Sequence, residues 1–434
     1  MSNSSFLPYP EYVTSTPSWL GPTPAGWRVL RGKYSFREYS ERSQTGAEVL
    51  LSVSEYFGVK PRRENIAGDD YLSRAESLIG YKKCAVNDLA MNIMLAWKKG
   101  LGVSKYDGII SPAYSVFRFA KHACPDYMHY LLRTDLYVDY FKARSTGIMD
   151  SRLRLYPDVF GDVALILPSE KEQTQIAKFL DYETLRIDAL IEKQQQLIAL
   201  LKEKRQAVIS HAVTKGLNPD APMRDSGVEW LGEVPAHWGV LATSRVSDLT
   251  TGGRDTQDAN PDGEYPFFVR SQTIERIDSY SFEGEGVLTS GDGAGVGKIY
   301  HHHVGRLEFH QRVYLFHNFR RITGRYFFYF LREHLAIVAL AGNAKSTVDS
   351  LRRPMLRAFP VCLPPLEEQE AITEFLDGTV ARIDALILRQ DGFRELLQER
   401  RTALISAAVT GKIDVRGWKA PEPQSTRKSY ERST

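Results

Sequence analysis

Residues 167–214 read LPSEKEQTQIAKFLDYETLRIDALIEKQQQLIALLKEKRQAVISHAVT, and residues 363–410 read LPPLEEQEAITEFLDGTVARIDALILRQDGFRELLQERRTALISAAVT. The two stretches align without a gap, and 25 of the 48 aligned positions carry the same residue. A duplication of this length determines the architecture. Each copy is proline-free after its third residue and has acidic residues near its start, so both copies are predicted to be long helices.

The apolar residues in each copy repeat with a period close to 3.5, which is typical of a coiled coil. An amphipathic helix lying on a globular core normally has a wider apolar stripe. A helix of about 47 residues is about 70 Å long, so we expect two paired spacer helices. Near their middle, Gln194 and Gln390 are expected to face each other. The predicted seam consists of Leu180, Ile187, Leu190, Gln194, Leu197, Leu201, Leu376, Ile383, Leu386, Gln390, Phe393 and Leu397.

Composition limits the class of protein. The length of 434 residues allows two to four domains, and the three scattered cysteines suit a reducing cytosol better than a disulfide framework. No membrane span and no signal-peptide pattern is present, so a cytoplasmic protein is expected. Because the net charge is only +3, nucleic-acid binding would depend on local basic patches.

A second repeated motif precedes each variable block: WLGPTPAGWRV at residues 19–29 and WLGEVPAHWGV at residues 230–240. Its prolines, glycines and paired tryptophans predict a rigid, non-helical clip whose indoles pack against other residues. A solvated linker is the alternative. Between each clip and the next long helix, apolar runs broken by Gly, Asp and Pro predict strands, for example at residues 108–119, and a helix is predicted at 126–144.

The predicted fold class is α+β, with two mixed α/β domains, or heads, joined by two long antiparallel coiled-coil helices in a pseudo-twofold repeat. Antiparallel pairing follows from the order clip, domain, helix, because it allows one domain at each end of the rod. The predicted segments are residues 1–166 (clip and first head), 167–217 (spacer helix 1), 218–362 (clip and second head), 363–414 (spacer helix 2) and 415–434 (a polar, disordered tail).

The sequence offers no catalytic site. The glycine-rich run at residues 284–303, GEGVLTSGDGAGVGKIYHHH, fails as a phosphate loop because Asp292 and Ile299 occupy the positions that need Gly and Ser or Thr. The three adjacent histidines, 301–303, lack Cys or carboxylate partners at ligand spacing, so alternating strand positions explain them better than a metal site. We therefore predict a non-catalytic protein without a metal site.

Basic and polar residues in each block are candidates for contacts with phosphates and base edges. A generally solvated surface is the alternative, because neither block is strongly basic. The candidate DNA-binding residues are Arg62, Arg63, Lys82, Lys83, Lys98, Lys99 and Lys105 in the first block and Arg270, Lys298, Arg306, His310, Gln311 and Arg312 in the second.

The paired P-x-x-x-E-Q-x-x-I-x-x-F-L-D helices, the W-L-G…P-x-x-W clips and the two dissimilar heads resemble the specificity subunit of type I restriction–modification enzymes. The resemblance covers nearly the whole chain. It implies that each head reads one half of a bipartite DNA site, and segments 108–117 and 287–298 look like recognition-domain segments of that family. The conserved helices would set the spacing between the heads and contact modification subunits.

The same resemblance places methylation and cleavage in partner methyltransferase and nuclease-translocase subunits, which would use S-adenosylmethionine, ATP and Mg²⁺. No cofactor is expected on this chain itself. Two alternatives remain at this point: a specificity partner of a methyltransferase-only or fused restriction system, and a coiled-coil adaptor that binds protein rather than DNA.

Overall fold

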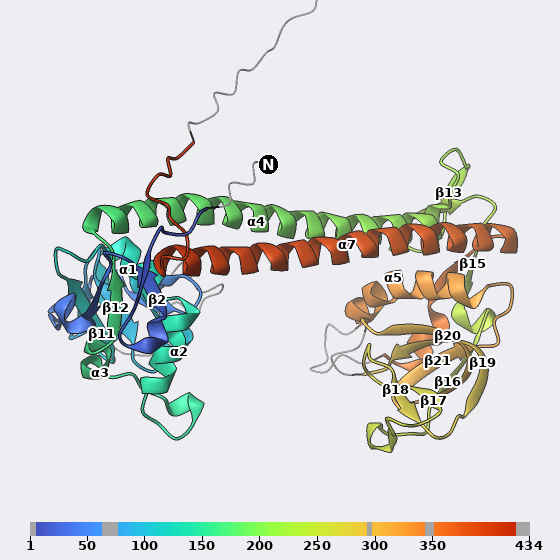
Figure 1. Cartoon of the computed structure of the whole chain (residues 1–434). Coiled ribbons are helices and arrows are strands. Elements are labelled where there is room, and N and C mark those ends of the chain that lie inside the picture. Colours follow the sequence, from blue (N-terminus) through green and yellow to red (C-terminus); the bar gives the residue numbers. More distant parts are fainter. Residues whose placement is uncertain (1–5, 63–76, 293–296, 343–350, 422–434) are drawn as a thin grey trace, which may run out of the picture. The chain divides into compact units, whose positions relative to one another are not determined.

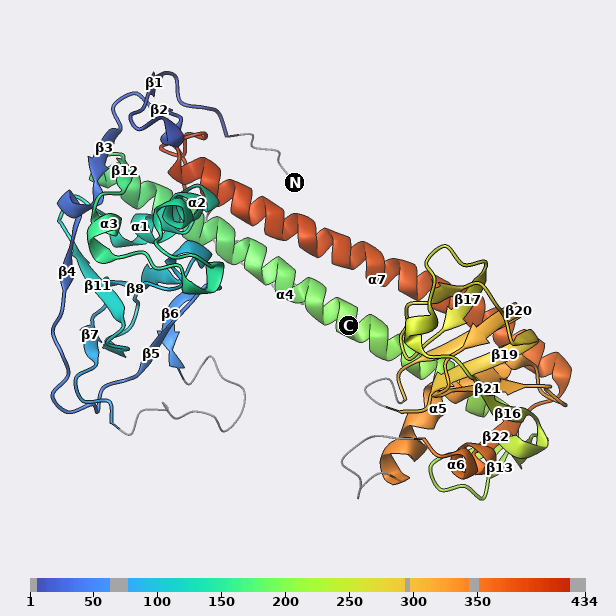
Figure 2. The ribbon, with the colours of Figure 1, turned by 90° about the horizontal axis from the view of Figure 1, so that it is seen from below.

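The computed structural model describes residues 6–62, 77–292, 297–342 and 351–421 (Figures 1 and 2). The chain divides into two compact units: residues 1–193 with 393–434, and residues 194–392. Each unit contains one head and a half of each long helix, α4 (Glu170–Lys215) and α7 (Leu366–Val409). Helices and strands are mixed, as the predicted α+β class requires.

Both long helices begin three residues after their predicted starts; α4 ends two residues before its predicted end at 217, and α7 ends at Val409 rather than at 414. Pro168 precedes α4, and the Ser169 hydroxyl accepts a hydrogen bond from the backbone N–H of Glu172 at 3.3 Å, which caps the first turn. After the last turns, Gly216 and Gly411 have φ of 78° and 75°. This left-handed conformation favours glycine and ends a helix.

In each unit an ion pair joins the halves of α4 and α7. In the second unit, Arg205 Nε lies 2.8 Å from Asp384 Oδ1, and in the first unit Arg401 Nε lies 2.8 Å from Asp188 Oδ1. Arg205 and Asp188 are 196 positions from Arg401 and Asp384, so the same contact occurs twice with the partners exchanged. In the second unit, Ile209 and Val213 near the end of α4 share an apolar cluster with Leu376 near the start of α7. The two halves are therefore antiparallel.

The seam follows steps of three and four residues, but not all predicted members belong to it. Leu190, Leu197, Leu386 and Phe393 were predicted in the seam, and this is wrong: they are 40–45% exposed. The position that follows Ile187 toward the partner is Ile191, four residues later. At about 100° per residue, Leu190 lies about 100° around the helix from Ile191. The buried or half-buried positions are Thr184, Ile187, Ile191, Gln194, Ile198 and Leu201 on α4 and Val380, Ile383, Ile387, Gln390, Arg394 and Leu397 on α7.

The two central glutamines are not level with each other. Because Arg205 pairs with Asp384, Gln390 lies level with residue 199 of α4, five residues from Gln194 and about 7.5 Å along the helix. The Oε1 atom of Gln194 is buried and accepts no hydrogen bond from the residues that the structure describes. The expected approach of the two amides therefore does not follow from this register.

The first head (residues 28–167) has a four-stranded sheet and two helices that pack against it. The helix expected at 126–144 is interrupted at Arg133 and Thr134, which separate α1 from α2. The sheet order is β4 (Phe36–Tyr39), β11 (Tyr114–Phe119), β8 (Leu89–Asn92), β9 (Leu101–Val103). The other elements are β3 (Arg28–Arg31), β5 (Leu51–Ser54), β6 (Gly58–Pro61), β7 (Lys82–Cys84), β10 (Gly108–Ile110), α1 (Pro125–Leu132), α2 (Asp135–Arg144), α3 (Pro157–Gly161) and β12 (Ala164–Leu167).

The second head (residues 239–363) repeats this plan with a larger sheet. Its order begins β16 (Asp248–Thr251), β21 (Val313–His317), β19 (Phe282–Ser290), β20 (Tyr300–Phe309), which corresponds to β4, β11, β8, β9. Two strands extend it, and as in the first head the entry strand pairs with the strand that leads into the long helix. The remaining elements are β15 (Gly239–Ala242), β17 (Tyr265–Phe268), β18 (Glu275–Ile277), α5 (Gly324–Gly342), α6 (Arg353–Ala358) and β22 (Pro360–Leu363).

The clips are largely extended, as predicted, apart from a short 3-10 turn at Ser18–Leu20 in the first one. Each is a two-stranded ribbon, β1 (Tyr12–Thr14) with β2 (Pro22–Pro24) and β13 (Met223–Asp225) with β14 (Glu233–Pro235). The indole N–H of Trp27 donates to Glu172 at 3.2 Å, and that of Trp238 donates to Glu368 at 2.9 Å. Each clip therefore packs on the first turn of the long helix that follows its head.

A buried glutamine joins each head to the helix it precedes. The Gln173 carboxamide donates to the carbonyls of His122 and Pro168 and accepts from the Cys124 N–H. Gln369 repeats this with Arg321, Pro364 and Thr323. The E-Q pair of the repeated motif is thus explained: the Glu holds the clip and the Gln holds the head.

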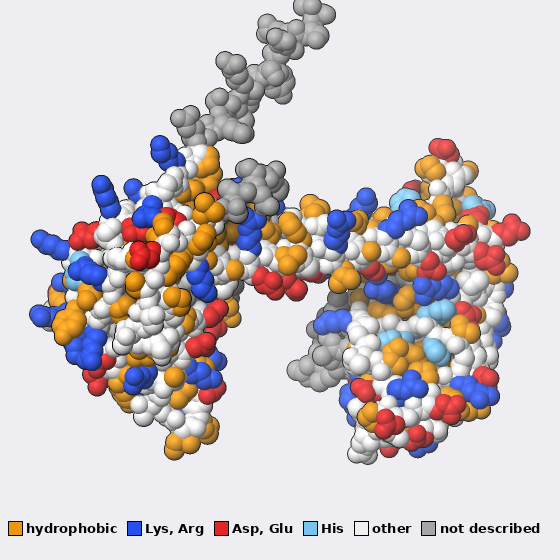
Figure 3. Space-filling model, in the orientation of Figure 1, with side chains coloured by type: hydrophobic (Ala, Val, Ile, Leu, Met, Phe, Trp, Pro, Cys, Tyr) orange, Lys and Arg blue, Asp and Glu red, His pale blue; other side chains and the backbone are white. Residues whose placement is uncertain are grey.

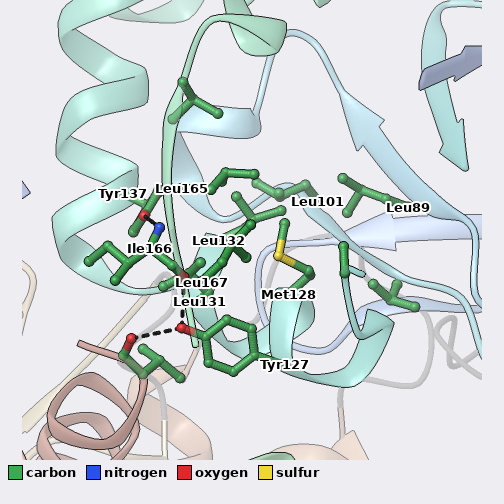
Figure 4. Packing of buried hydrophobic residues seen from close by; sticks show 14 of the residues in the cluster. Leu89, Leu101, Tyr127, Met128, Leu131, Leu132, Tyr137, Leu165, Ile166 and Leu167 are labelled. Atoms are coloured by element: carbon green, nitrogen blue, oxygen red, sulfur yellow. Dashed lines mark hydrogen bonds between the residues drawn. The ribbon is translucent and has the colours of Figure 1, made fainter. Parts of the chain in front are cut away.

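A buried tyrosine connects each head to the end of the other long helix. The Tyr127 hydroxyl lies 2.9 Å from the Ile166 carbonyl and 3.1 Å from the Val409 carbonyl (Figure 4). In the second head, the Tyr326 hydroxyl donates to the Val213 carbonyl at 2.9 Å. These tyrosines lie within the two large apolar clusters, so each head closes over the start of one long helix and the end of the other.

The expected disordered tail begins later than predicted. Val415 is buried, and the Trp418 ring packs edge-on against Phe179 with centroids 5.4 Å apart. The Gln175 amide donates to the carbonyls of Val415 and Trp418. The expectation of a tail from residue 415 is therefore wrong for residues 415–418, whereas residues 422–434 lie outside the described part.

We expect Gln194→Leu to stabilise the chain by about 1 kcal/mol, because the change removes a buried acceptor that has no partner. The midpoint of urea unfolding is the measurement, and Gln195→Leu, at an exposed neighbouring position, serves as the control. A lower midpoint for Gln194→Leu alone would mean that this amide has a stabilising partner.

We also expect acid to destabilise the second unit through His334. This imidazole is 5% exposed, lies between the rings of Trp230 and Phe330, and neither nitrogen has a partner among the described residues. Burial lowers its pKa to about 4, below the value of about 6.5 expected when unfolded. The contribution of neutral His334 to the free energy of unfolding is therefore fully present above pH about 6.5. It declines as the pH falls toward 4, because the unfolded chain takes up the proton first.

His334→Phe should raise the unfolding midpoint, and its advantage over the wild type should grow by about 1.4 kcal/mol per pH unit over that range. A difference between the two proteins that does not change with pH would contradict this account.

Candidate nucleic-acid interface

Three polar side chains meet at one edge of the second head, around Asp292. Asp292 follows β19, Arg312 precedes β21 and Arg270 follows β17. Arg312 Nη1 lies 2.6 Å from Asp292 Oδ2, and Arg270 Nη1 lies 3.0 Å from Asp292 Oδ1. The Arg270 and Arg312 side chains are 40% and 58% exposed. One carboxylate thus orients two arginines toward solvent.

A close approach of two strands brings a second carboxylate to this edge. An ideal Cβ on Gly252 would lie 1.8 Å from the Phe309 carbonyl oxygen, so only glycine permits this contact. The contact places Asp255 beside the loop between β20 and β21, where its carboxylate accepts from Gln311 Nε2 at 2.8 Å. We call Arg270, Asp292, Gln311 and Arg312, with Asp255 behind them, the Asp292 cluster.

The electrostatics of the cluster fix its protonation states. Partial burial opposes ionisation of Asp292, but the hydrogen bonds from Arg312 and Arg270 outweigh it and lower the pKa of this carboxyl. Burial, together with Arg270, lowers the pKa of His310. Its Nδ1 accepts from the Arg312 N–H at 2.9 Å, so the neutral ring carries its proton on Nε2.

The structure places some of the candidate DNA-binding residues of the second block in the Asp292 cluster and others outside it. Arg270, Gln311 and Arg312 belong to the Asp292 cluster, and Lys298 is exposed at the start of β20. His310 is 1% exposed, so its prediction as a DNA-contacting residue is wrong: it positions the Arg312 backbone instead. Arg306 lies outside the cluster and pairs with Glu283 at 3.1 Å above the Tyr280 ring.

The candidates of the first block do not form one patch. Lys82 is 9% exposed and donates to the Tyr114 carbonyl, so its prediction as a surface contact is wrong. Lys83, the next residue of β7, pairs with Glu41 at 2.7 Å. The Arg62 side chain is half-buried, with its backbone N–H bonded to Leu50, and Arg63 lies outside the described residues.

Lys98, Lys99 and Lys105 form a separate group near α1 and α2. Lys98 lies over the Trp97 ring, with Nζ 4.9 Å from the centroid. Lys99 pairs with Asp135 at 2.6 Å and Lys105 pairs with Asp126. Together with Arg401, Lys98 and Lys99 line a cleft of about 850 Å³ between this head and the helix halves of its own unit.

The acidic residues of the Asp292 cluster were missed at the sequence level. Asp292 was noted only as the residue that breaks a phosphate-loop pattern, and Asp255 was not considered. The available signal was weak: an acidic residue after a strand, flanked by glycines. Which arginines an acid orients depends on loop conformation, which the strand pattern does not contain.

The outer faces of the long helices carry exposed apolar side chains, visible along both helices in Figure 3. Leu190, Phe393 and Leu396 belong to the first unit, and Leu386, Leu197 and Leu200 are their equivalents in the second. Exposed leucines in such a row are uncommon unless a partner covers them. They include the four residues that were predicted for the seam.

Two other kinds of site were also considered. Among the described residues, no three His, Cys, Asp or Glu side chains are grouped so that they could hold a metal ion. None of the helices in that part of the chain has the length and apolar composition that a membrane crossing needs.

Comparison with known proteins identifies the class. Residues 235–388 match the family model of the type I restriction modification DNA specificity domain, which covers the second head and the first half of α7. The EcoDI specificity subunit of Escherichia coli is 28% identical over 182 residues, which is 42% of this chain and 40% of that protein. The MjaVIII specificity subunit of Methanocaldococcus jannaschii is 26% identical over 286 residues, 59% of this chain and 64% of that one.

Solved structures agree on the fold. A chain from a study of assembly and conformational transition of the type I R-M system has a TM-score of 0.70 at 19% identity and covers 90% of this chain and 99% of its own. The HsdS subunit from Thermoanaerobacter tengcongensis has a TM-score of 0.53 at 17% identity, with 92% and 100% covered. The fold is thus that of a two-headed protein with a duplicated helix and clip. Residues 235–388 therefore carry a type I restriction modification DNA specificity domain, and the chain as a whole is similar to type I restriction enzyme specificity subunits. It aligns with less than two thirds of the length of these curated relatives.

Proposed function

We propose that this chain is a non-catalytic, sequence-specific DNA-binding subunit in which each head reads one half of a bipartite duplex site. The family assignment supports DNA as the ligand. The observation that carries the proposal is the Asp292 cluster: two exposed arginines that pair with one carboxylate in the loops at the ends of β17, β19 and β21. A guanidinium held at one side and free at the other matches the paired acceptors O6 and N7 of guanine in the major groove.

The chemistry of the assembly is assigned to partner subunits. Modification subunits would transfer the methyl group from S-adenosylmethionine to adenine, and restriction subunits would use ATP and Mg²⁺ to translocate and cut cytoplasmic DNA. The exposed apolar residues of each unit, such as Leu396 and its equivalent Leu200, are proposed to contact modification subunits. Because the row occurs once in each unit, we expect two copies of that partner.

The experiment that tests DNA binding uses the full chain and a labelled mixed-sequence duplex, with affinity measured by anisotropy between about 50 and 200 mM salt. Phosphate contacts release counterions, so log K should fall linearly with log salt, with a slope of about −0.9 for each phosphate neutralised. An adaptor that binds only protein would bind no duplex, and this result would refute the proposal. The purified chain should transfer no methyl group and cut no DNA.

We expect Asp292→Asn to relax recognition in the second half-site. Asn keeps the size of the side chain but loses the charge that holds Arg270 and Arg312, so discrimination between bases at the contacted positions should fall by about 1–3 kcal/mol. Selection from a pool of randomised duplexes, followed by sequencing, measures this. Asp262→Asn removes the same charge from an exposed turn of the same head and should leave the preference unchanged. Unaltered discrimination by Asp292→Asn would exclude the cluster from base reading.

A further inference from the structure

The second head carries a group of arginines away from the Asp292 cluster, which we call the arginine face. Arg245 ends a short 3-10 helix, Arg352 precedes α6, and α6 itself contributes two more (Figure 2). Arg353 and Arg357 line an open hollow of about 550 Å³ between α6 and the segment that runs from β15 into the short 3-10 helix. The arginine face consists of Arg245, Arg352, Arg353 and Arg357, all exposed.

These arginines lack acidic partners. Arg353 donates to the Leu249 carbonyl at 2.5 Å, which fixes α6 against β16. The described residues provide no carboxylate within ion-pair distance of any of the four. Nearby Arg320, by contrast, pairs with Asp248 at 2.9 Å. Four guanidinium groups without acidic partners, carried by α6 and by the 3-10 helix packed beside it, repel one another, and an anionic ligand would relieve that repulsion.

The corresponding surface of the first head is neutralised. There the matching 3-10 helix, Gly32–Tyr34, contributes Lys33, which pairs with Asp162 at 3.1 Å just after α3. Arg31 lies 3.6 Å from the same carboxylate, and α3 begins with an acidic turn at Asp158. Since the two heads share one plan, the arginine face is an addition to the second head and not a requirement of the fold.

The arginine face is continuous with the Asp292 cluster. The Leu351 N–H donates to the Gly291 carbonyl at 2.8 Å, and the Tyr314 hydroxyl donates to the Leu351 carbonyl at 3.2 Å. Leu351, which bonds to Gly291 next to Asp292, is therefore the one residue between the cluster and Arg352. A ligand that extends from the cluster along the β16 edge would meet the arginine face next.

From this placement we propose that the arginine face binds the sugar–phosphate backbone of the duplex whose bases the second head reads. The inference rests on the proposed function and deepens it. Guanidinium groups pair with phosphate oxygens through two parallel hydrogen bonds, and such contacts position a protein on DNA without reading sequence. The second head would then hold its half-site with more phosphate contacts than the first head.

The test compares wild type with the triple variant Arg245→Ala, Arg352→Ala, Arg357→Ala, which leaves the structural Arg353 in place. Binding of the full chain to a mixed-sequence duplex of about 40 base pairs is measured between about 50 and 200 mM salt. The slope of log K against log salt should become shallower by about 0.9 per lost contact, so by up to about 2.7. Base preference in the second half-site should stay the same.

The control is Lys202→Ala, Arg382→Ala, Arg389→Ala, which removes the same charge from exposed helix positions of the same unit. This control should keep the wild-type slope. A wild-type slope in the arginine-face variant would overturn the inference, and loss of restriction with DNA binding intact would assign the face to an acidic protein partner instead. Failure of wild type to bind any duplex would refute the proposed function itself, which is a different result.

Discussion

Everything in this structure depends on how each head is fastened to the two long helices. At each junction a buried glutamine, Gln173 or Gln369, satisfies three backbone groups, while the preceding glutamate accepts the indole N–H of the clip. Leaving one such buried backbone group unpaired costs about 1–3 kcal/mol. A tyrosine from the head reaches the end of the other helix. The junction therefore fixes the head to both helices with directional bonds, independently of what the loops of the head contain.

This arrangement separates the constant parts of the protein from the variable parts. The residues that make the junction recur at nearly constant spacing in the two halves, as do the Arg205–Asp384 and Asp188–Arg401 pairs. The edges of the heads differ: the second head orients two arginines on Asp292, whereas the lysines of the first head are distributed over separate surfaces. Such a division suits a protein that presents two different recognition surfaces on one repeated support.

Much of the fold was predictable from the sequence because it is repeated. The helix limits follow from Pro168 and Gly216, the clips from paired tryptophans, and the plan of the heads from their strand patterns. The prediction of the seam residues was only partly correct, because a 3.5-residue period alone does not determine whether Leu190 or Ile191 is the next seam residue after Ile187. The tail was misjudged because the polar residues after Trp418 obscured the apolar contacts of Val415 and Trp418.

The candidate site was less predictable. Counting basic residues found Arg270 and Arg312, but it could not tell that Lys82 is buried or that His310 supports the backbone. Arg245, Arg352 and Arg357 were not singled out, because they are far apart in the sequence or belong to a segment that resembles an ordinary helix. Charge in a sequence is a count, whereas binding depends on which charges remain unpaired after folding.

The central claim is that each head reads its own half-site. The most direct measurement is the methylated motif in a host that carries the chain with its modification subunits, compared with a chimaera in which residues 241–362 are replaced by the corresponding head of a relative. The account predicts a motif of two defined sequences around an unread spacer, and only one of the two changes in the chimaera. A continuous motif, or a chimaera in which both sequences change, would contradict it.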